Sequence, residues 1–401
     1  MKTRILFLST ILLLCIFTRP VSGQPTVTVT TVAELETAVA QANDQGGNMI
    51  IQVADGTYAL NDTLYINAPH VTITSLSGHR ESVIIEGDAM SATANIGNVI
   101  RVAAADVQIS NLTLQKSRWH LIQVAGEDDA DNFVARNIIF RDAYEQMLKV
   151  TYNAGNPDVG ADNGLVEDSL FEYTAGIGPQ YYIGGIDAHQ AHDWIVRNNT
   201  FRDIASPSES VAEHAIHFWS NSVGTIVENN IIINCDRGIG YGLTAGRGHD
   251  GGIIRNNMIY HSDNGDPFAD TGIALWYSPD TLVFNNTIYL AHNYPWAIEY
   301  RFPETTNVAI RNNLANKAIM ARDGASGTVN NNVTAADSSW FVNLAQGNLH
   351  LVTMAATQIS VIDQGVFLAE VPTDIDGNAR PQGSAYDIGA DELMMGLSPK
   401  A

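Results

Sequence analysis

The sequence predicts an all-β protein that folds as a single-stranded parallel β-helix, a solenoid of about ten coils with a short α-helix capping its N-terminal end. Three observations support this prediction. Short strands alternate Ile or Val with polar residues and are broken by Gly, Asn and Asp. An Asn-Asn pair follows many of these strands, as in VRNNTF, VENNII and IRNNMI. The pattern recurs from Asn111 to Asn331 in steps of 19 to 31 residues, close to the period of about 20 to 50 residues typical of solenoids.

The N-terminal region is predicted to contain a signal peptide and a cap. Residues 1–23 have a basic start, the apolar run ILFLSTILLLCIF and small residues that end at Gly23, which is the pattern of a secretory signal peptide. A secreted protein, extracellular or periplasmic, with no membrane contact after signal removal is therefore expected, since no other apolar stretch approaches the roughly 20 residues of a membrane span. Residues 24–48 are expected to form the N-terminal cap, because Thr31 and Glu34 have capping-box spacing ahead of an amphipathic helix.

The β-helix itself is expected over residues 49–340. Coils of such a solenoid stack about 4.8 Å apart, so asparagines at one turn position hydrogen-bond from coil to coil. The first asparagine of each pair, including Asn229, is assigned to this ladder. Residues 341–401 are expected to form a final coil and a closing segment. Asp374 and Asp376 suggest Ca²⁺ there, but Ala385 stands where an EF-hand has its glutamate, which favours closure.

Composition limits the partners. The chain has 43 acidic against 21 basic residues and a formal net charge of −22. Such a chain is not expected to bind nucleic acid, and an anionic polysaccharide would need local cations, histidines or Ca²⁺. The sequence requires no cofactor, although Ca²⁺ is possible. Cys235 is the one cysteine outside the signal peptide, so no internal disulfide is expected, and a monomer is expected.

A second set of strands precedes the asparagine turns and predicts two outward columns of side chains. With Ile or Leu facing inward, alternation places one residue of each coil in the first outward column: Arg101, Gln123, Lys149, Asp187, His217, Gly240, Ala274 and Glu299. The second outward column is Ala103, Ala125, Thr151, His189, Trp219, Gly242, Trp276 and Arg301. Titratable groups beside large aromatic residues are typical of sites where sugars stack and protons move. The glycines predict a dip between the histidines and Trp276.

At these residues the chain resembles the right-handed parallel β-helix proteins of the pectin-lyase-like superfamily. GGIDAH at residues 184–189, followed one coil later by EHAIHF, is similar to the paired motif of mannuronan C5-epimerases. The resemblance implies right-handed coils, and it implies that His189 and His214 are acid-base groups supported by Asp187. The chain departs from the motif at Ala188, where the family has proline, and likewise at Gln190 and Gly184.

The sequence therefore predicts an enzyme that acts on an extracellular uronate-containing polysaccharide by removing the proton α to the carboxylate, as a polysaccharide lyase or a C5-epimerase. The catalytic candidates are His189, His214 and Asp187, and the substrate-binding candidates are Lys149, His217, Trp219, Trp276, Glu299 and Arg301.

Three alternatives stay open. A glycoside hydrolase would use Asp187 with Glu213 as paired carboxylates. A non-catalytic glycan-binding or structural solenoid would use its tryptophans only to stack sugars. A metal site could be built from His189, His192, His214 and His217, although His-x-x-His spacing suits a helix better than a strand. The roles of His192, Tyr181 and Tyr182 are open, with core packing the preferred interpretation for the two tyrosines.

Overall fold

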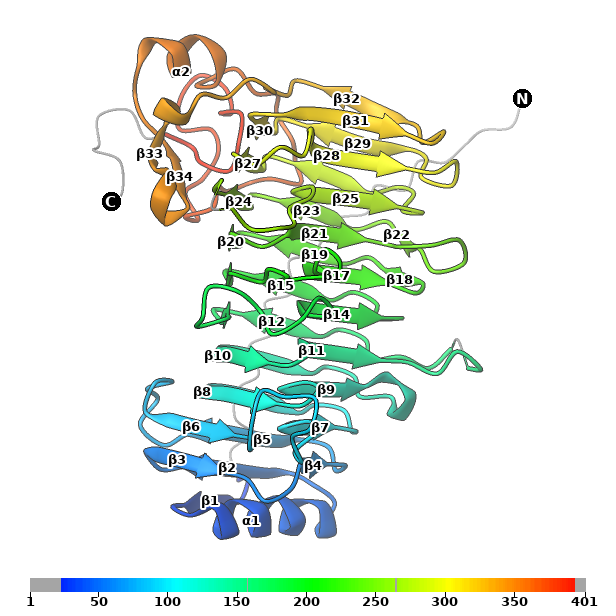
Figure 1. The fold of residues 1–401 in the computed structure, drawn as a ribbon, viewed down its shortest axis with the longest axis vertical. Helices are drawn as coiled ribbons and strands as arrows, with labels where there is room; N and C mark the ends of the chain where they lie inside the picture. The colour runs from blue at the N-terminus through cyan, green and yellow to red at the C-terminus, as the bar shows by residue number, and fades with distance from the viewer. Residues whose placement is uncertain (1–22, 157, 264, 394–401) are drawn as a thin grey trace.

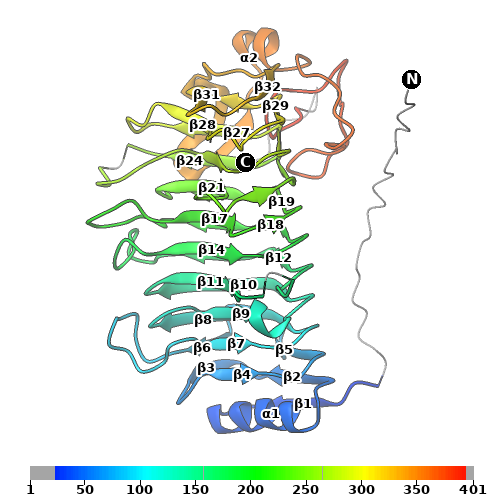
Figure 2. The same ribbon diagram turned by 90° about the vertical axis from the view of Figure 1, so that its right-hand side faces the viewer.

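The computed structural model describes residues 23–156, 158–263 and 265–393, so the predicted signal peptide lies, except for Gly23, outside the described residues. The chain winds into a tall parallel β-helix whose coils stack one above another (Figures 1 and 2). This confirms the predicted all-β solenoid. In the described part of the chain, no helix has the length and apolar character needed to cross a bilayer.

One face of the solenoid is a sheet of ten parallel strands, one from each coil. We call it the site sheet. In stacking order its strands are β4 (Leu64–Ile66), β7 (Ile100–Val102), β9 (Ile122–Ala125), β11 (Gln146–Thr151), β14 (Gly184–His189), β17 (His214–Trp219), β21 (Arg237–Tyr241), β25 (Ile273–Trp276), β28 (Trp296–Arg301) and β31 (Ala318–Arg322).

The remaining faces are formed by two ladders of parallel strands that are joined into one sheet of twenty strands. The first ladder contains β1 (Thr26–Val29), β2 (Met49–Val53), β5 (Val71–Ser75), β8 (Gln108–Ser117), β10 (Val134–Ala143), β12 (Leu165–Glu167), β15 (Ile195–Arg197), β19 (Ile226–Glu228), β23 (Ile253–Arg255), β26 (Leu282–Phe284), β29 (Val308–Arg311) and β32 (Gly327–Asn330). The second contains β3 (Gly56–Ala59), β6 (Val83–Glu86), β13 (Leu170–Glu172), β16 (Thr200–Arg202), β20 (Ile231–Ile233), β24 (Met258–His261), β27 (Thr287–Leu290) and β30 (Leu314–Ala315), and it shares β8 and β10 with the first. Two short strands, β18 (Ser222–Val223) and β22 (His249–Asp250), pair separately.

The core between these sheets is aliphatic and aromatic, as the alternation predicts. Buried Ile and Val side chains stack in columns along the axis. Phe140, Phe171 and Phe201 form one such column, with ring centroids 4.2 and 4.5 Å apart in successive coils. Because each coil contributes one residue at each position, the core is continuous along the solenoid, and it fixes the register in which the outward residues also stack.

The bend between the two ladders contains the Asn-Asn pairs, and here the structure differs from the prediction. The ladder is built by the second asparagine of each pair, in which the side-chain amide donates to the side-chain oxygen of the next coil at 2.9–3.0 Å. Its members are Asn199, Asn230, Asn257, Asn286, Asn313 and Asn332. The assignment of Asn229 to this ladder is therefore wrong, whereas the predicted first-position residue Asn137 does donate to Asn111 of the preceding coil at 2.8 Å. Asn229 has a φ of 56°, a left-handed conformation that asparagine tolerates better than most residues.

Both ends of the solenoid are covered. Helix α1 (Val32–Asp44) has the predicted capping box between Thr31 and Glu34, and its buried face packs against the first coil. At the other end, the antiparallel pair β33 (Phe341–Asn343) and β34 (Asn348–Leu351), helix α2 (Ala355–Ser360) and the final loops lie beside the last coils (Figure 1). The loops accept hydrogen bonds from the coil asparagines Asn256, Asn285 and Asn312. Asp374 supports their turn by accepting the backbone N–H of Asn378 at 2.8 Å.

Candidate functional site

The outward columns of the site sheet follow the predicted register. Lys149 of β11 pairs with Asp187 of β14, and Asp187 pairs with His217 of β17. His189 and Trp219 are register partners in the second column. The first column continues through Gly240 and Ala274 to Glu299, as predicted. The stacking of coils alone thus places chemically different side chains from three or more coils side by side.

At the middle of this face, Lys149, Asp187, His189 and Trp219 form a buried hydrogen-bonded network, which we call the lysine network. The ammonium of Lys149 forms a short ion pair with Oδ2 of Asp187 and lies 2.8 Å from Nε2 of His189. Oδ1 of Asp187 accepts the indole N–H of Trp219 at 2.6 Å. Nδ1 of His189 lies 2.9 Å from the hydroxyl of Ser220. Each member is therefore held by at least one neighbour from another coil or loop.

Burial and charge set the protonation of this network. Burial lowers the pKa of His189 to about 3, and Asp187 opposes this shift only in part, so the imidazole is neutral at ordinary pH. Burial favours the neutral form of Asp187, but the charge and hydrogen bond of Lys149 hold its pKa well below the usual range. Burial would also lower the pKa of Lys149, yet the charge of Asp187 raises it. The network is thus an ammonium, a carboxylate and a neutral imidazole in contact.

Aromatic rings surround His189. Tyr152 stacks on its imidazole, with centroids 4.8 Å apart and planes at 9°. Trp219 lies on another side at 4.4 Å. Tyr182 is 42% exposed, and partial burial raises the pKa of its hydroxyl although Lys149 opposes the rise. The interpretation of Tyr181 and Tyr182 as core residues is wrong, because both side chains lie at the surface.

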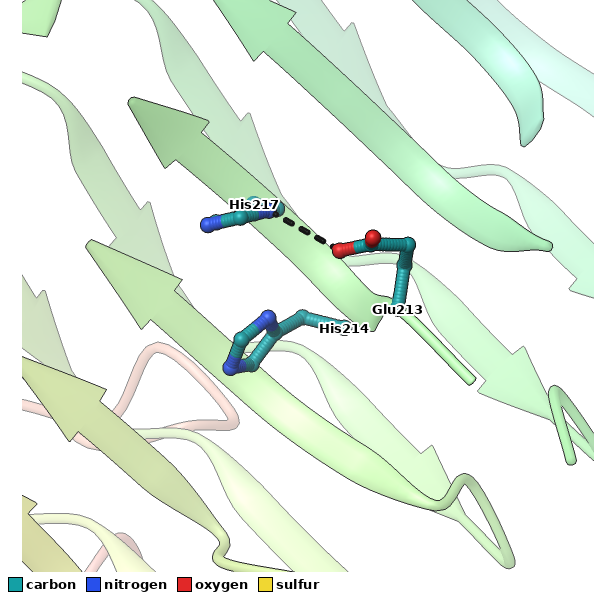
Figure 3. Close-up of side chains that lie close together, drawn as sticks. All are labelled: Glu213, His214 and His217. Carbon is teal, nitrogen blue, oxygen red and sulfur yellow. Dashed lines mark ion pairs between the residues drawn. The ribbon is translucent and has the colours of Figure 1, made fainter. Parts of the chain in front are cut away.

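A second cluster, made of Glu213, His214 and His217, lies beside the lysine network (Figure 3). The two imidazole centroids are 4.6 Å apart, and Nδ1 of His217 is 3.5 Å from Oε2 of Glu213. The same nitrogen is 3.9 Å from Oδ1 of Asp187, which connects the two clusters. His214 does not join the lysine network: among the described residues, neither of its ring nitrogens has a hydrogen-bond partner. Burial lowers the pKa of His214 well below its usual value.

A third group continues the face toward the C-terminal end. The indole N–H of Trp276 donates to Glu299 at 2.9 Å, and Arg322 pairs with the other oxygen of Glu299 at 2.6 Å. Arg301 lies over the ring of Trp276, 5.4 Å from its centroid, and pairs with Asp323. This group therefore presents a half-buried indole between cationic side chains rather than an acid-base pair.

Two expectations about exposure need correction. The catalytic candidates were expected on an open outer face, but Asp187, His189 and His214 are only 2%, 7% and 1% exposed. Residues outside the sheet contribute to this burial: Tyr152 stacks on His189, and Arg247 lies over the ring of Trp219 beside it. The expected dip beside Trp276 is filled as well, because the ring of His214 lies over Gly240, where a β-carbon would stand 2.6 Å from its Nε2.

Three residues of the site are not among those predicted from the sequence. Ser220 follows directly after the β17 strand, and Tyr152 follows directly after β11, so strand-end positions could have indicated both. Arg322 belongs to β31, whose sequence AIMAR was not among the predicted strands, although it is the register partner of Arg301. The imidazole of His192 lies beside Asp162, with its Nδ1 3.3 Å from Oδ1. Among the described residues, His192 and His189 are not part of the group of possible ligands that contains His214 and His217, so the four-histidine metal site is not formed.

Comparison with known proteins agrees with this fold. Residues 184–352 match the family model for a right handed beta helix region. An alginate lyase from Paenibacillus sp. strain FPU-7 superposes with a TM-score of 0.53 at 16% identity, covering 77% of this chain and 99% of that chain. A mutant of the family PL6 alginate lyase AlyGC has a TM-score of 0.45 at 13% identity and covers 94% of this chain and 59% of that chain.

A family GH87 α-1,3-glucanase from Streptomyces thermodiastaticus gives a TM-score of 0.41 at 13% identity, covering 79% of this chain and 71% of that chain. No curated protein sequence matches the chain. At 16% identity, the likeness to the Paenibacillus alginate lyase shows a common fold alone. The parallel register along the solenoid and the family model over residues 184–352 together show the fold of a right-handed parallel β-helix.

Proposed function

We propose that the protein is a secreted enzyme that acts on an extracellular uronate-containing polysaccharide, as a polysaccharide lyase or a C5-epimerase. Both reactions begin when a base removes the proton α to the sugar carboxylate, and both need positive charge beside that carboxylate. The observation that carries the proposal is the lysine network, in which the neutral imidazole of His189 and the ammonium of Lys149 lie 2.8 Å apart.

His189 is the proposed base. Its pKa of about 3 leaves the ring unprotonated at neutral pH. If Nδ1 donates to the hydroxyl of Ser220, the lone pair is on Nε2, which faces Lys149. A bound uronate brings negative charge close to this ring, which raises the pKa of the imidazole and so strengthens the base where it is needed.

Lys149 is the proposed partner of the sugar carboxylate. An ammonium has three N–H donors, and Asp187 and His189 occupy two of them, so the third is available to the substrate. When Lys149 turns toward a uronate, Nε2 of His189 is released to accept the proton. Asp187 acts as a positioning residue, since its charge keeps the buried ammonium protonated.

Tyr182 is the proposed proton donor, in place of His214. Its raised pKa keeps the phenol protonated, and its position at the surface lets it reach a sugar. His214 lacks a dissociable imidazolium proton at neutral pH, because burial holds its pKa far down. The half-buried side chains of Trp219, Trp276 and Arg301 are proposed to contact neighbouring sugars. His217 and Glu299 are 0% and 1% exposed, so their proposed role is to support these contacts.

The test is a screen of polymannuronate, polyguluronate and polygalacturonate in D₂O, with a neutral dextran as control. New ultraviolet absorbance from unsaturated ends identifies a lyase. Deuterium at C5 of an intact chain identifies an epimerase. Absence of both from every uronan would contradict the proposal, and binding of an oligosaccharide without turnover would favour the glycan-binding alternative.

The hydrolase alternative is less well supported by the geometry. A glycosidase pair needs one carboxyl group that gives up a proton and two groups that flank the sugar. Asp187 is held ionised, and both of its oxygens are occupied, by Trp219 and by Lys149. That leaves Glu213 without an acid-base partner at the surface. Release of new reducing ends without unsaturation would restore this alternative.

A further inference from the structure

The cluster of Glu213, His214 and His217 is distinct from the lysine network in its chemistry. Glu213 precedes β17, and both histidines emerge from that strand toward the same side (Figure 3). One ligand atom from each of the three residues lies within 4.8 Å of the other two. The side chain of Glu213 is 27% exposed, whereas His214 and His217 are almost completely buried. The cluster therefore has one side open to solvent and two imidazoles fixed inside.

Three nitrogen atoms in this cluster lack a partner. Among the described residues, Nδ1 and Nε2 of His214 and Nδ1 of His217 are buried without a hydrogen bond. Buried polar atoms in native proteins are nearly always paired, because burying one without a partner costs its hydration. Here one nitrogen of each ring lies beside a carboxylate, so one missing ligand could satisfy one unpaired nitrogen of His214 and Nδ1 of His217 at once.

The tautomer of His217 identifies the charge of that ligand. Nε2 of His217 lies 3.1 Å from the carbonyl oxygen of Gly242, which only an N–H can satisfy. In the neutral ring, Nδ1 then carries a lone pair that faces Oε2 of Glu213 at 3.5 Å and Oδ1 of Asp187 at 3.9 Å. A lone pair opposite two carboxylates is favourable only with a cation between them. The Nε2 contact with the carbonyl is also the outer-shell bond that metal-bound histidines usually make.

From this geometry we infer that Glu213, His214 and His217 bind a divalent first-row transition metal ion, with Zn²⁺ as the expected ion. Two imidazoles and one carboxylate are the protein ligands of one common class of zinc site, which keeps a further position open to water or substrate. Imidazole ligands disfavour Ca²⁺ and Mg²⁺. A tetrahedral zinc with ligands at about 2.0 to 2.1 Å separates them by about 3.3 Å, close to the 3.5 Å between His217 and Glu213.

Gly240 makes room for this arrangement. A β-carbon at that position would lie 2.6 Å from Nε2 of His214, so any larger residue would push the ring away. The inference does not depend on the proposed reaction, since metal binding can be measured without any polysaccharide. Failure of the metal experiment would leave the uronan assay untouched, and the reverse also holds.

The experiment is calorimetric titration of the chelator-treated full chain with Zn²⁺, followed by Co²⁺ substitution, whose visible absorption reports imidazole coordination. The expected result for wild type is a site that is lost in His214→Ala and weakened at least about 100-fold in Glu213→Gln. Glu213→Gln is the variant that guards against misfolding, because Glu213 is partly exposed and glutamine keeps its shape. His192→Ala is the matched control and should bind Zn²⁺ like wild type.

A second group, His350, Asp376 and Asp391, could also hold an ion, so stoichiometry is compared in His350→Gln. A site that persists in His350→Gln, is weakened at least about 100-fold in Glu213→Gln and is lost in His214→Ala supports the inference. Zn²⁺ binding that is unchanged by Glu213→Gln with its fold intact by circular dichroism would overturn it. The absence of Zn²⁺ binding by wild type would also overturn it.

Discussion

The asparagine ladder and the outward face of the site sheet are built by the same stacking of coils but use it differently. In the ladder, one residue type repeats at one position, and each amide finds its partner in the identical residue of the next coil. On the site sheet, successive coils place Lys149, Asp187 and His217 at one position, so each group meets an unlike neighbour. The ladder hydrogen bonds are uncharged, whereas the outward face carries charge.

Polar satisfaction separates the two regions further. Asn257 uses its amide nitrogen and its oxygen in bonds to neighbouring coils at 2.9–3.0 Å. Three imidazole nitrogens of the neighbouring face have no partner among the described residues. Repeated identical residues therefore form the part of this solenoid that stabilises the fold. Unlike residues in register, some of whose polar atoms lack a hydrogen-bond partner, form the part that can bind a ligand.

The largest effect is expected for His189→Gln, which tests the proposed base on the site sheet. Removing one positioned base should lower turnover of a uronan by about 10² to 10⁴-fold, since glutamine keeps much of the volume but cannot accept the proton. Turnover is followed by unsaturated ends or by deuterium exchange at C5. Asn257→Val is the matched control and should retain normal turnover per folded molecule. Equal turnover in wild type and His189→Gln would remove His189 from the mechanism.

On the structural side, Asn257→Val should break the ladder at its middle. The substitution removes the oxygen of Asn257 that accepts the backbone N–H and the side-chain amide of Asn230. It also removes the amide that donates to the oxygen of Asn286, at a cost of about 1–3 kcal/mol for each buried group left unpaired. Asn332→Val is the control, because Asn332 ends the ladder and has a ladder neighbour on one side only. Urea unfolding measures both free energies. A larger loss for Asn332→Val would show that stability does not come from amides paired on both sides.

Acid should distinguish the two regions, because amides do not titrate. Burial puts the pKa of His189 at about 3 in the folded state, against about 6.5 when unfolded. Between these values the unfolded chain binds more protons, so His189 contributes stability near pH 7 that is lost as pH falls from about 6.5 toward 3. Its share of the slope approaches about 1.4 kcal/mol per pH unit in the middle of that range.

The measurement is the free energy of unfolding against pH for wild type and two variants, all in the presence of a chelator. Below pH 6.5, the free energy of unfolding of His189→Gln should fall less steeply than that of wild type, because unfolding of the variant takes up as much as one proton fewer. Asn257→Val should run parallel to wild type at a lower level. An unchanged slope in His189→Gln would mean that the imidazole is already protonated in the folded protein.

The fold could be predicted because its signals are local. Strand alternation and the recurrence of Asn-Asn pairs fix where each coil turns, and the capping box at Thr31 fixes where α1 begins. The ladder was misassigned by one residue because recurrence gives the step between coils but not which of two adjacent asparagines faces inward. Asn229 takes the left-handed turn, and Asn230 points into the stack.

The register of the site could be predicted, but its burial could not. Alternation places Asp187 and His189 on the outward side of the strand. The ring that stacks on His189 belongs to Tyr152, which lies outside the sheet, and loop residues leave no periodic signal in the sequence. The sequence disfavours a metal site built from His189, His192, His214 and His217, because His-x-x-His spacing suits one face of a helix better than an extended strand. In β17, Ala215 and Ile216 both pack in the hydrophobic core, so the strand does not alternate regularly there, and the rings of His214 and His217 come within 4.6 Å of each other.

The smallest effect is expected at Trp276, and it tests how far the binding face extends beyond the lysine network. The indole of Trp276 is half-buried between Arg237 and Arg301, 5.7 and 5.4 Å from its centroid, and a sugar ring could pack on its exposed part. Trp276→Ala should weaken binding of a uronate oligosaccharide by about 0.5–1.5 kcal/mol, the usual contribution of one aromatic face, and leave turnover at saturating substrate nearly unchanged.

Trp119→Ala is the control, because Trp119 is 43% exposed and precedes β9, several coils away. Both affinities are measured by quenching of tryptophan fluorescence. If Trp119→Ala weakens binding more than Trp276→Ala, the sugar chain runs toward the N-terminal coils, and the third group of the site sheet is structural like the ladder.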